Sequence, residues 1–477
     1  MVSSVVPAGK NRYRLPKSGK MRVDALVFMK PELMRDFEEA GALDQLAGAA
    51  ALPGVVADVI GMPDLHQGFG LPIGGVMAVD AQSGVVSAGA VGYDINCGVR
   101  LLSSRVPQHS MDKPLLRRLM QAIEQRIPAG VGKKTRLREL EPRLEYVVSR
   151  GAHAMVEMGY GRSEDLDCIE EGGCLAAASL DQVSQRAVQR GDQLATLGGG
   201  NHFIEIDRVD ECFDRELALR FGLREGFLAV MQHSGSRGFG HQICEDYSRR
   251  MADEAGLFGI ELPSRGLACA PIGSELGQGY LSAMAAAVNF AFANRQLMTH
   301  LVRQAFLEVM ATSEGEMGLD LVYDLAHNIA KLEEYRGRKL LVHRKGATRA
   351  LPKNHPGNPR RYRESGHPVI IPGSMGTASY LVVGEPGLHE TFFSANHGAG
   401  RALSRSASRK SLGREDFERD MGEVLYNARD YRRLIDEAPA AYKDIDAVVD
   451  TMVEIGLTRK VAKLKPLAVV KGEGRES

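Results

Sequence analysis

Histidines that stand beside glycine or asparagine in short turns are the residues of this sequence best suited to chemistry. The chain has 13 histidines in 477 residues, and several follow short apolar stretches, where binding loops commonly lie. Six stretches combine such histidines or other polar residues with glycine: Asp64-Leu65-His66-Gln67-Gly68, Gly92-Tyr93-Asp94-Ile95-Asn96-Cys97-Gly98, Gly198-Gly199-Gly200-Asn201-His202-Phe203-Ile204-Glu205, His233-Ser234-Gly235-Ser236-Arg237-Gly238, Asp324-Leu325-Ala326-His327-Asn328 and Ser394-Ala395-Asn396-His397-Gly398-Ala399-Gly400-Arg401. They form the candidate functional site.

The turn around Asp94 and Cys97 indicates metal binding. These two residues are three positions apart between Gly92 and Gly98, so a carboxylate and a thiolate can converge on one cation. One cysteine, one aspartate and several histidines suit Zn²⁺, Mn²⁺, Co²⁺ or Fe²⁺ and argue against Mg²⁺, which prefers oxygen ligands. A single histidine of this kind is more often a satisfied core or surface residue; only the several turns together favour a site.

Other motifs narrow the class of enzyme. The run Gly198-Gly199-Gly200-Asn201 is able to present backbone N–H groups to a phosphate, and a flexible turn explains it about equally well. The sequence contains no GxxxxGK[ST] motif, which excludes a P-loop, and no HExxH motif. It also lacks Lys-x-Asp-Gly, so the lysine nucleophile of ordinary polynucleotide ligases is missing.

The elements that must position these residues are short strands and a few long helices. Apolar, glycine-rich runs predict strands at residues 22–29, 74–80, 85–90, 98–103, 227–231, 321–324, 369–371 and 379–383. Helical spacing of apolar residues predicts helices at 112–126, 180–194 and 281–310. The last 75 or so residues are expected to alternate short helices with loops. No internal repeat or Ser/Pro-rich linker divides the chain.

Charge is balanced overall and basic in one segment. The sequence has 60 Lys and Arg against 60 Asp and Glu, so attraction to a polyanion must come from a local patch. Between residues 331 and 375 there are eleven Lys and Arg against three acidic residues, as expected of a groove for a phosphate backbone, or of a solvated loop. Tryptophan is absent and aromatic residues make up 6%, so no base-stacking surface is evident.

The composition predicts a cytoplasmic protein. No apolar run approaches the roughly 20 residues that a membrane helix needs, and the first residues have no secretory signal pattern. The six cysteines contain no CxxC pair, so disulfides are not expected in a chain of this size. We expect residues 1–20 to form a surface segment and residues 21–477 to form one catalytic domain.

Taken in order, the six stretches closely resemble the RNA-splicing ligase RtcB family, from about Met21 to Gly472. The resemblance implies an α+β fold, a single large mixed α/β body without a P-loop or a lysine-nucleophile ligase domain. It implies an RNA ligase that joins a 3′-phosphate or 2′,3′-cyclic phosphate end to a 5′-hydroxyl end in tRNA splicing or RNA repair. The expected cofactor is a pair of Mn²⁺ ions, with GTP as co-substrate. The expected partners are RNA and the activating protein archease, with no membrane.

The resemblance also assigns roles to residues. It implies metal ligands at Asp94, Cys97, His202, His233 and His327, with Cys97 bridging the two ions, and makes His397 the histidine that becomes guanylylated. Guanylate-binding positions match Asn201, Glu205, Ser374, Ser379, Ala399, Gly400, Tyr442 and Lys471. Phosphates of the RNA are expected near Arg237, Lys345, Arg401 and Arg405, and Asp64 and His66 match the family's Asp-Leu-His turn.

Three other functions fit part of the same pattern. A guanylyltransferase that caps 3′-phosphate ends would share His397 and the metal ligands but would join no strand. A metal-dependent phosphatase or cyclic phosphodiesterase would use the metal ligands with water and would form no covalent nucleotide. A non-catalytic RNA-binding protein would rest on the basic segment alone. The sequence does not reveal the oligomeric state or the RNA that is joined.

Overall fold

Two large β-sheets form the framework of the protein. The computed structural model describes residues 5–35, 37, 40–137, 143–428 and 431–472. The seven-stranded sheet runs β1 (Val6–Gly9), β2 (Arg12–Leu15), β3 (Ala25–Phe28), β4 (Val59–His66), β5 (Ile73–Asp80), β13 (Arg338–Lys345) and β12 (Asn328–Tyr335). The eight-stranded sheet runs β11 (Gly318–Ala326), β7 (Gly98–Pro107), β9 (Phe227–Ser234), β8 (Phe203–Cys212), β19 (Thr458–Lys471), β16 (Ser379–Gly384) and β15 (Pro368–Ile371), and β18 (Leu425–Tyr426) pairs with β19.

Two short strand pairs, fourteen α-helices and several 3₁₀ helices complete the described part of the chain. The pairs are β6 (Val85–Ser87) with β10 (Cys269–Pro271), and β14 (Ala347–Arg349) with β17 (Ser394–Asn396). The helices are α1 (Pro31–Arg35), α2 (Ala40–Ala49), α3 (Ala88–Val91), α4 (Lys113–Arg126), α5 (Leu144–Arg150), α6 (Ala152–Glu157), α7 (Gln185–Val188), α8 (Arg215–Arg220), α9 (Arg237–Glu254), α10 (Glu275–Met310), α11 (Glu314–Met317), α12 (Arg405–Ser411), α13 (Arg414–Met421) and α14 (Ile445–Val453). The mixed α/β architecture expected from the sequence is confirmed.

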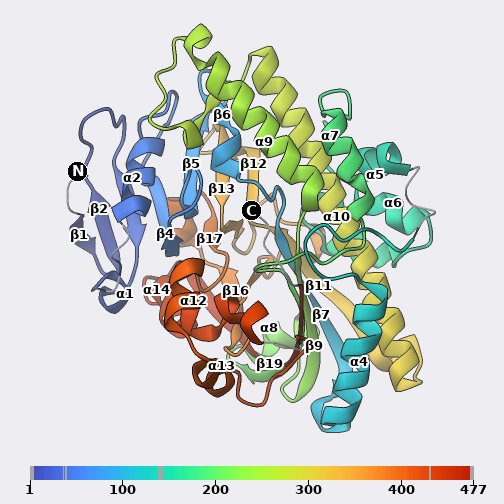
Figure 1. Ribbon diagram of the computed structural model, residues 1–477. Coiled ribbons are helices and arrows are strands. Elements are labelled where there is room, and N and C mark those ends of the chain that lie inside the picture. The colour runs from blue at the N-terminus through green and yellow to red at the C-terminus, as the bar shows by residue number, and fades with distance from the viewer. Residues whose placement is uncertain (1–4, 36, 38–39, 138–142, 429–430, 473–477) are drawn as a thin grey trace.

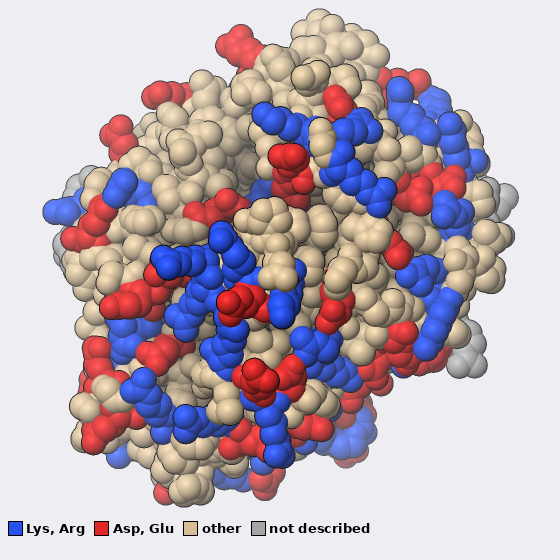
Figure 2. All heavy atoms as spheres, turned by 180° about the vertical axis from the view of Figure 1, so that it is seen from behind, with Lys and Arg blue, Asp and Glu red and all other residues tan. Residues whose placement is uncertain are grey.

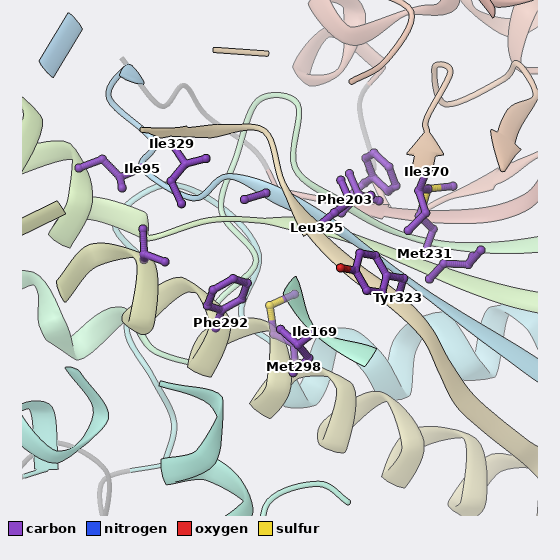
Figure 3. Close-up of a cluster of buried hydrophobic side chains, with 14 of the residues drawn as sticks. Ile95, Ile169, Phe203, Met231, Phe292, Met298, Tyr323, Leu325, Ile329 and Ile370 are labelled. Carbon is purple, nitrogen blue, oxygen red and sulfur yellow. The ribbon is translucent and has the colours of Figure 1, made fainter. Parts of the chain in front are cut away.

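The longest helix, α10, runs through the core beside α9 (Figure 1). Ser274 caps it, because its side chain accepts a hydrogen bond from the backbone N–H of Gly277 at 3.0 Å. Every residue from 283 to 299 is buried, so the middle of this helix has no solvent-facing side. Figure 3 shows its residues Phe292 and Met298 in one apolar cluster with Tyr323 and Leu325 of β11.

A second, smaller apolar cluster joins the two sheets. Phe28, Ile60 and Val342 of the seven-stranded sheet contribute to it. Val382 of the eight-stranded sheet and Val449 of α14 pack into the same cluster. The two sheets are thereby held in a fixed relation, with the candidate site between their ends.

Most of the expected elements are confirmed. Six expected strands lie within observed ones: 74–80 in β5, 98–103 in β7, 227–231 in β9, 321–324 in β11, 369–371 in β15 and 379–383 in β16. The strand expected at 22–29 contains β3. The helix expected at 112–126 is α4, and that at 281–310 is the larger part of α10. Asp112 caps α4 by accepting a hydrogen bond from Leu115 N at 2.8 Å.

Three expectations are wrong. The strand expected at 85–90 ends at Ser87, whose hydroxyl accepts from Ala90 N and begins α3. Residues 180–194 contain only α7 and a 3₁₀ helix (Gln189–Gln193) around Gly191. The last 75 or so residues were expected to contain only short helices and loops, but they also contain the 14-residue strand β19. Proline is rare inside strands, and Pro466 lies in β19 beside a shift in register.

The first residues belong partly to the sheet. Strand β1 is exposed along its length, as expected of a surface segment, but β2 pairs with β3 and Leu15 is fully buried. Residues 1–4 and 473–477 of the two expected regions lie outside the described residues, and the proposed boundary at residue 21 stays a prediction. Within the described part of the chain, no helix is long and apolar enough to cross a membrane.

Candidate metal and nucleotide site

All six polar stretches meet at one cavity of about 420 Å³. The seven-stranded sheet contributes His66 at the end of β4, and the loop after β17 contributes His397. Sixteen of the twenty predicted site residues line it: His66, Asp94, Cys97, Asn201, Glu205, His233, His327, Lys345, Ser374, His397, Ala399, Gly400, Arg401, Arg405, Tyr442 and Lys471. The other four, Asp64, His202, Arg237 and Ser379, do not line it.

The register of one sheet explains why the predicted metal ligands meet. Strands β11, β7, β9 and β8 are neighbours and all antiparallel. His327 follows the end of β11 and His233 lies near the end of β9, whereas Cys97 precedes β7 and His202 precedes β8. In an antiparallel sheet the end of one strand lies beside the start of the next, so all four side chains reach the same edge.

At this edge the donor atoms are close together. The Sγ of Cys97 lies 3.2 Å from Nε2 of His202 and 3.2 Å from Nε2 of His233. Nε2 of His202 lies 2.8 Å from Oδ2 of Asp94, and Nε2 of His233 lies 3.3 Å from Nε2 of His327. The cysteine and the first two histidines form a group whose ligand atoms all lie within 4.8 Å of one another.

The surroundings of His233, His327 and Asp94 hold these three groups in the protonation states that bind metal. Burial lowers the pKa of His233 and of His327 well below the ordinary value, so both imidazoles are neutral near pH 7. Burial acts to raise the pKa of Asp94, but its hydrogen bond with His202 and the nearby positive charges outweigh burial, and the pKa lies below its usual range. A thiol, neutral imidazoles and a carboxylate are a donor set that fits a divalent ion of borderline softness.

His397 lies against this cluster and is oriented by Asp64. Its ring centroid is 4.7 Å from that of His327. Its Nδ1 lies 2.6 Å from Oδ2 of the fully buried Asp64, and its backbone N–H donates to the same oxygen at 3.0 Å. Gly400 allows this contact, because its φ is +72° and a Cβ there would lie 2.4 Å from the carbonyl oxygen of Asp64.

The other half of the cavity is charged, and its basic side chains and Tyr442 contact Glu437. Tyr442 donates a hydrogen bond to Glu437, and Arg401, Arg405 and Lys471 lie 3.4, 3.4 and 3.6 Å from its carboxylate oxygens. Burial acts to raise the pKa of Glu437, but these cations outweigh it and the pKa is lowered. The sequence analysis missed Glu437, because nothing in its local sequence distinguishes it from an ordinary surface glutamate.

Glu205 lines the same half of the cavity and is 3% exposed. Burial raises the pKa of Glu205 well above its usual value, with a contribution from Asp207 two residues along β8. Asp207 is fully buried, and neither of its carboxylate oxygens has a hydrogen-bond partner among the described residues. Burial raises its pKa to about 8, so this side chain is protonated near pH 7.

Two of the predicted residues that do not line the cavity, Arg237 and Ser379, make hydrogen bonds to other residues of the site. The guanidinium of Arg237 is 1% exposed and donates to Nδ1 of His202 at 3.1 Å. The Oγ of Ser379 accepts a hydrogen bond from Gly373 N at 3.0 Å, next to Ser374. Lys345 does line the cavity, and its Nζ donates to the carbonyl oxygens of Phe69 and Gly89.

The basic segment is not one continuous surface groove, so that expectation is wrong for part of it. Lys331 and Arg349 pair with Glu170 and Glu171, and Arg344 pairs with Glu333. These cations and Lys345 are buried or nearly so. The other basic residues of the segment are exposed. Figure 2 shows that lysines and arginines on one face of the molecule are mixed with acidic side chains.

Comparisons with known proteins find one family along nearly the whole chain. Residues 45–472 match the family model described as tRNA-splicing ligase RtcB. A protein of Thermococcus kodakarensis named tRNA-splicing ligase RtcB is 46% identical over 472 residues, which covers 97% of this chain and 98% of the relative. A protein of Mycobacterium tuberculosis named RNA-splicing ligase RtcB is 44% identical over 438 residues, covering 90% of this chain and all of the relative.

The cysteine of the donor cluster provides a test of metal binding. Cys97→Ala removes the only thiol in the cluster, so we expect the purified protein to lose most of its affinity for Mn²⁺, measured by titration with detection of free Mn²⁺ by electron paramagnetic resonance. Cys269→Ala is the control, because Cys269 is equally buried but does not line the cavity. Equal Mn²⁺ affinity in the two variants would contradict the assignment.

Asp207 provides a test by pH. The folded state keeps its proton up to about pH 8, whereas the unfolded chain releases it near pH 4, so wild-type stability falls as pH rises between these values. Asp207→Asn removes this effect. We expect the variant to be more stable than wild type by a margin that grows by about 1 kcal/mol per pH unit from pH 5.5 to 7.5, measured by urea denaturation. A margin that does not change with pH would contradict a buried, protonated Asp207.

Proposed function

The chain belongs to the RtcB family, and from this premise we propose that it is an RNA ligase acting in tRNA splicing or RNA repair. The proposed reaction joins an RNA 3′-phosphate or 2′,3′-cyclic phosphate to a 5′-hydroxyl, with GTP as co-substrate. The observation that carries the proposal is the position of His397 between Asp64 and the donor cluster. A histidine beside metal ligands in a cavity lined by cations suits nucleotidyl transfer.

The hydrogen bond to Asp64 selects the reactive nitrogen of His397. A proton on Nδ1 is shared with the buried carboxylate, which leaves the lone pair on Nε2. This nitrogen attacks the α-phosphorus of GTP, a P–N bond forms, and pyrophosphate leaves with the electrons of the broken P–O bond. The product is a histidine–guanylate phosphoramidate.

The cations of the cavity reduce the repulsion that a triphosphate meets. Arg401, Arg405 and Lys471 surround Glu437, so three positive side chains outnumber one carboxylate at this wall. Asp94, Cys97, His202, His233 and His327 would hold the Mn²⁺ ions, which would neutralise charge on the phosphate oxygens. The side chains themselves bind and orient the nucleotide.

Glu205 is the proposed reader of the base. Burial favours the protonated form of Glu205, but the N1–H and 2-amino donors of a bound guanine would stabilise the carboxylate, and adenine offers neither donor. Because Glu205 is nearly inaccessible to water, binding adenine would leave its carboxylate unpaired. The site therefore favours GTP over ATP.

The second half of the reaction uses the guanylate. GMP passes from His397 to the RNA 3′-phosphate and forms an activated phosphoanhydride. The 5′-hydroxyl oxygen of the second strand attacks this phosphate, and GMP leaves. A 2′,3′-cyclic phosphate must first be opened by water to the 3′-phosphate. Archease as an activator remains an expectation from the family resemblance.

Replacing the nucleophile gives the sharpest test of the first step. His397→Ala lacks the attacking nitrogen, so we expect no covalent adduct after incubation with radiolabelled GTP and Mn²⁺, detected on a denaturing gel. His109→Ala, a change at an exposed histidine far along the chain, is expected to label as the wild type does. Labelling of the His397→Ala protein would refute the assignment.

Nucleotide choice tests Glu205. Glu205→Ala removes the acceptor for guanine, so we expect the preference for GTP over ATP in adduct formation to fall by about 100-fold or more. The measurement compares adduct formation rates with the two labelled nucleotides. Undiminished selectivity would assign discrimination to another residue.

One experiment separates the proposed function from its alternatives. The protein is incubated with labelled GTP and Mn²⁺ and then with RNA strands that end in 3′-phosphate and 5′-hydroxyl. A ligase yields the joined strand, whereas a capping guanylyltransferase yields only a guanylylated 3′ end. A metal-dependent phosphatase or phosphodiesterase forms no nucleotide adduct and leaves the strands unjoined. We expect the joined strand.

A further inference from the structure

Helix α10 carries polar side chains into the core behind the candidate metal site. Asn294 and Arg295 are both fully buried. A buried charge is costly unless it is paired and hydrogen-bonded. Arg295 therefore has to satisfy its five N–H donors inside the protein.

The guanidinium of Arg295 donates to three separate segments of the chain. NH1 donates to the backbone carbonyl oxygens of Asn96 at 2.8 Å and Ser234 at 2.9 Å. NH2 donates to Oδ1 of Asn96 at 3.1 Å and lies 2.8 Å from Oδ1 of Asp324. Nε also donates to Asp324, at 2.9 Å. All five donors are used.

Each of these segments carries a proposed metal ligand. Asn96 lies between Asp94 and Cys97, and Ser234 follows His233. Asp324 lies on β11, three residues before His327, whose backbone N–H donates to the carbonyl oxygen of Cys97 at 2.9 Å. One side chain thus contacts the backbone or side chains beside four of the five ligands.

The residues on either side of Cys97 leave room for this guanidinium. A Cβ at Gly98 would lie 3.0 Å from Cζ of Arg295 and 2.3 Å from the carbonyl oxygen of Leu325, so only glycine fits after Cys97. Asn96 has a φ of +52°, a conformation that asparagine tolerates better than most residues. The residues on both sides of Cys97 are thereby explained, Asn96 by its hydrogen bond from Arg295 and Gly98 by the close approach of Arg295 and β11.

We propose that Arg295 is a positioning residue for the metal centre, holding the turn of Asp94 and Cys97, the end of β9 and the end of β11 in one geometry. The inference rests on the proposed function only in taking Mn²⁺ as the ion. Lysine cannot replace it, because its ammonium has three donors at one point, whereas the guanidinium is a planar fork that reaches three segments at once. Loss of the fork frees the ligand-bearing segments to move separately.

The test is Mn²⁺ binding by Arg295→Lys, measured on the metal-free protein by electron paramagnetic resonance without GTP or RNA. The substitution keeps a positive charge beside Asp324, which also pairs with Arg100 at 2.6 Å, so the variant is expected to fold. We expect its dissociation constant for Mn²⁺ to rise about 10- to 100-fold, the usual effect of losing a residue that orients metal ligands.

Arg303→Lys is the matched control. Arg303 lies on the same helix, is 3% exposed, and donates to Asp165 and to the carbonyl oxygen of Leu319. Its contact with β11 is at Leu319, near the start of the strand and eight residues before His327. We expect this variant to lose thermal stability to a similar degree but to bind Mn²⁺ as tightly as wild type.

A second variant changes Asn96, whose side chain accepts a hydrogen bond from Arg295. Asn96→Gly keeps the positive φ but removes one acceptor of Arg295, and it is expected to weaken Mn²⁺ binding less than Arg295→Lys does. Wild-type affinity in Arg295→Lys, or an equal loss in Arg303→Lys, would overturn the proposal. A wild-type protein that binds no Mn²⁺ would instead contradict the metal centre itself.

Discussion

The hydrogen bond between Asp64 and Nδ1 of His397 is the contact on which the proposed chemistry depends. Asp64 has no exposed surface, and one of its oxygens accepts from the ring and from the backbone N–H groups of His397 and Gly398. Hydrogen bonds to a charged group are worth about 1.5–3 kcal/mol each. This arrangement keeps the imidazole in one tautomer and one orientation, with Nε2 as its only lone pair.

The remainder of the site follows from strand order. Four neighbouring antiparallel strands bring a cysteine and three histidines from sequence positions 97 to 327 to one sheet edge, and the seven-stranded sheet brings Asp64 to face them. The buried arginines behind this edge give the ligand-bearing turns a rigid support. They are Arg100 and Arg295, which share the buried carboxylate of Asp324.

Local pattern was enough to predict β7, β9 and β11 and the helices α4 and α10, but it did not predict β8, which follows His202. It failed for β19, because Pro466 and the alternating lysines hide a central strand, and for residues 180–194, where Gly191 interrupts helical spacing. Eleven of the sixteen expected residues that line the cavity lie in the six polar stretches, and the family resemblance alone implied the other five, Lys345, Ser374, Arg405, Tyr442 and Lys471. Neither source revealed Glu437 or Arg295, whose roles come from contacts with residues distant in the sequence.

In the segment between residues 331 and 375, the sequence likewise did not show which charged side chains are exposed. Counting its basic residues predicted a phosphate groove, but a count does not show that Lys331, Arg344 and Arg349 face glutamates in the interior. Pairing of this kind is a property of the tertiary structure.

The central claim is tested most directly by a crystal structure of the protein after exposure to GTP and Mn²⁺. The account predicts phosphorus bonded to Nε2 of His397, Asp64 still bonded to Nδ1, and metal density beside the sulfur of Cys97. Phosphorus on another residue, or on Nδ1 of His397, would contradict it.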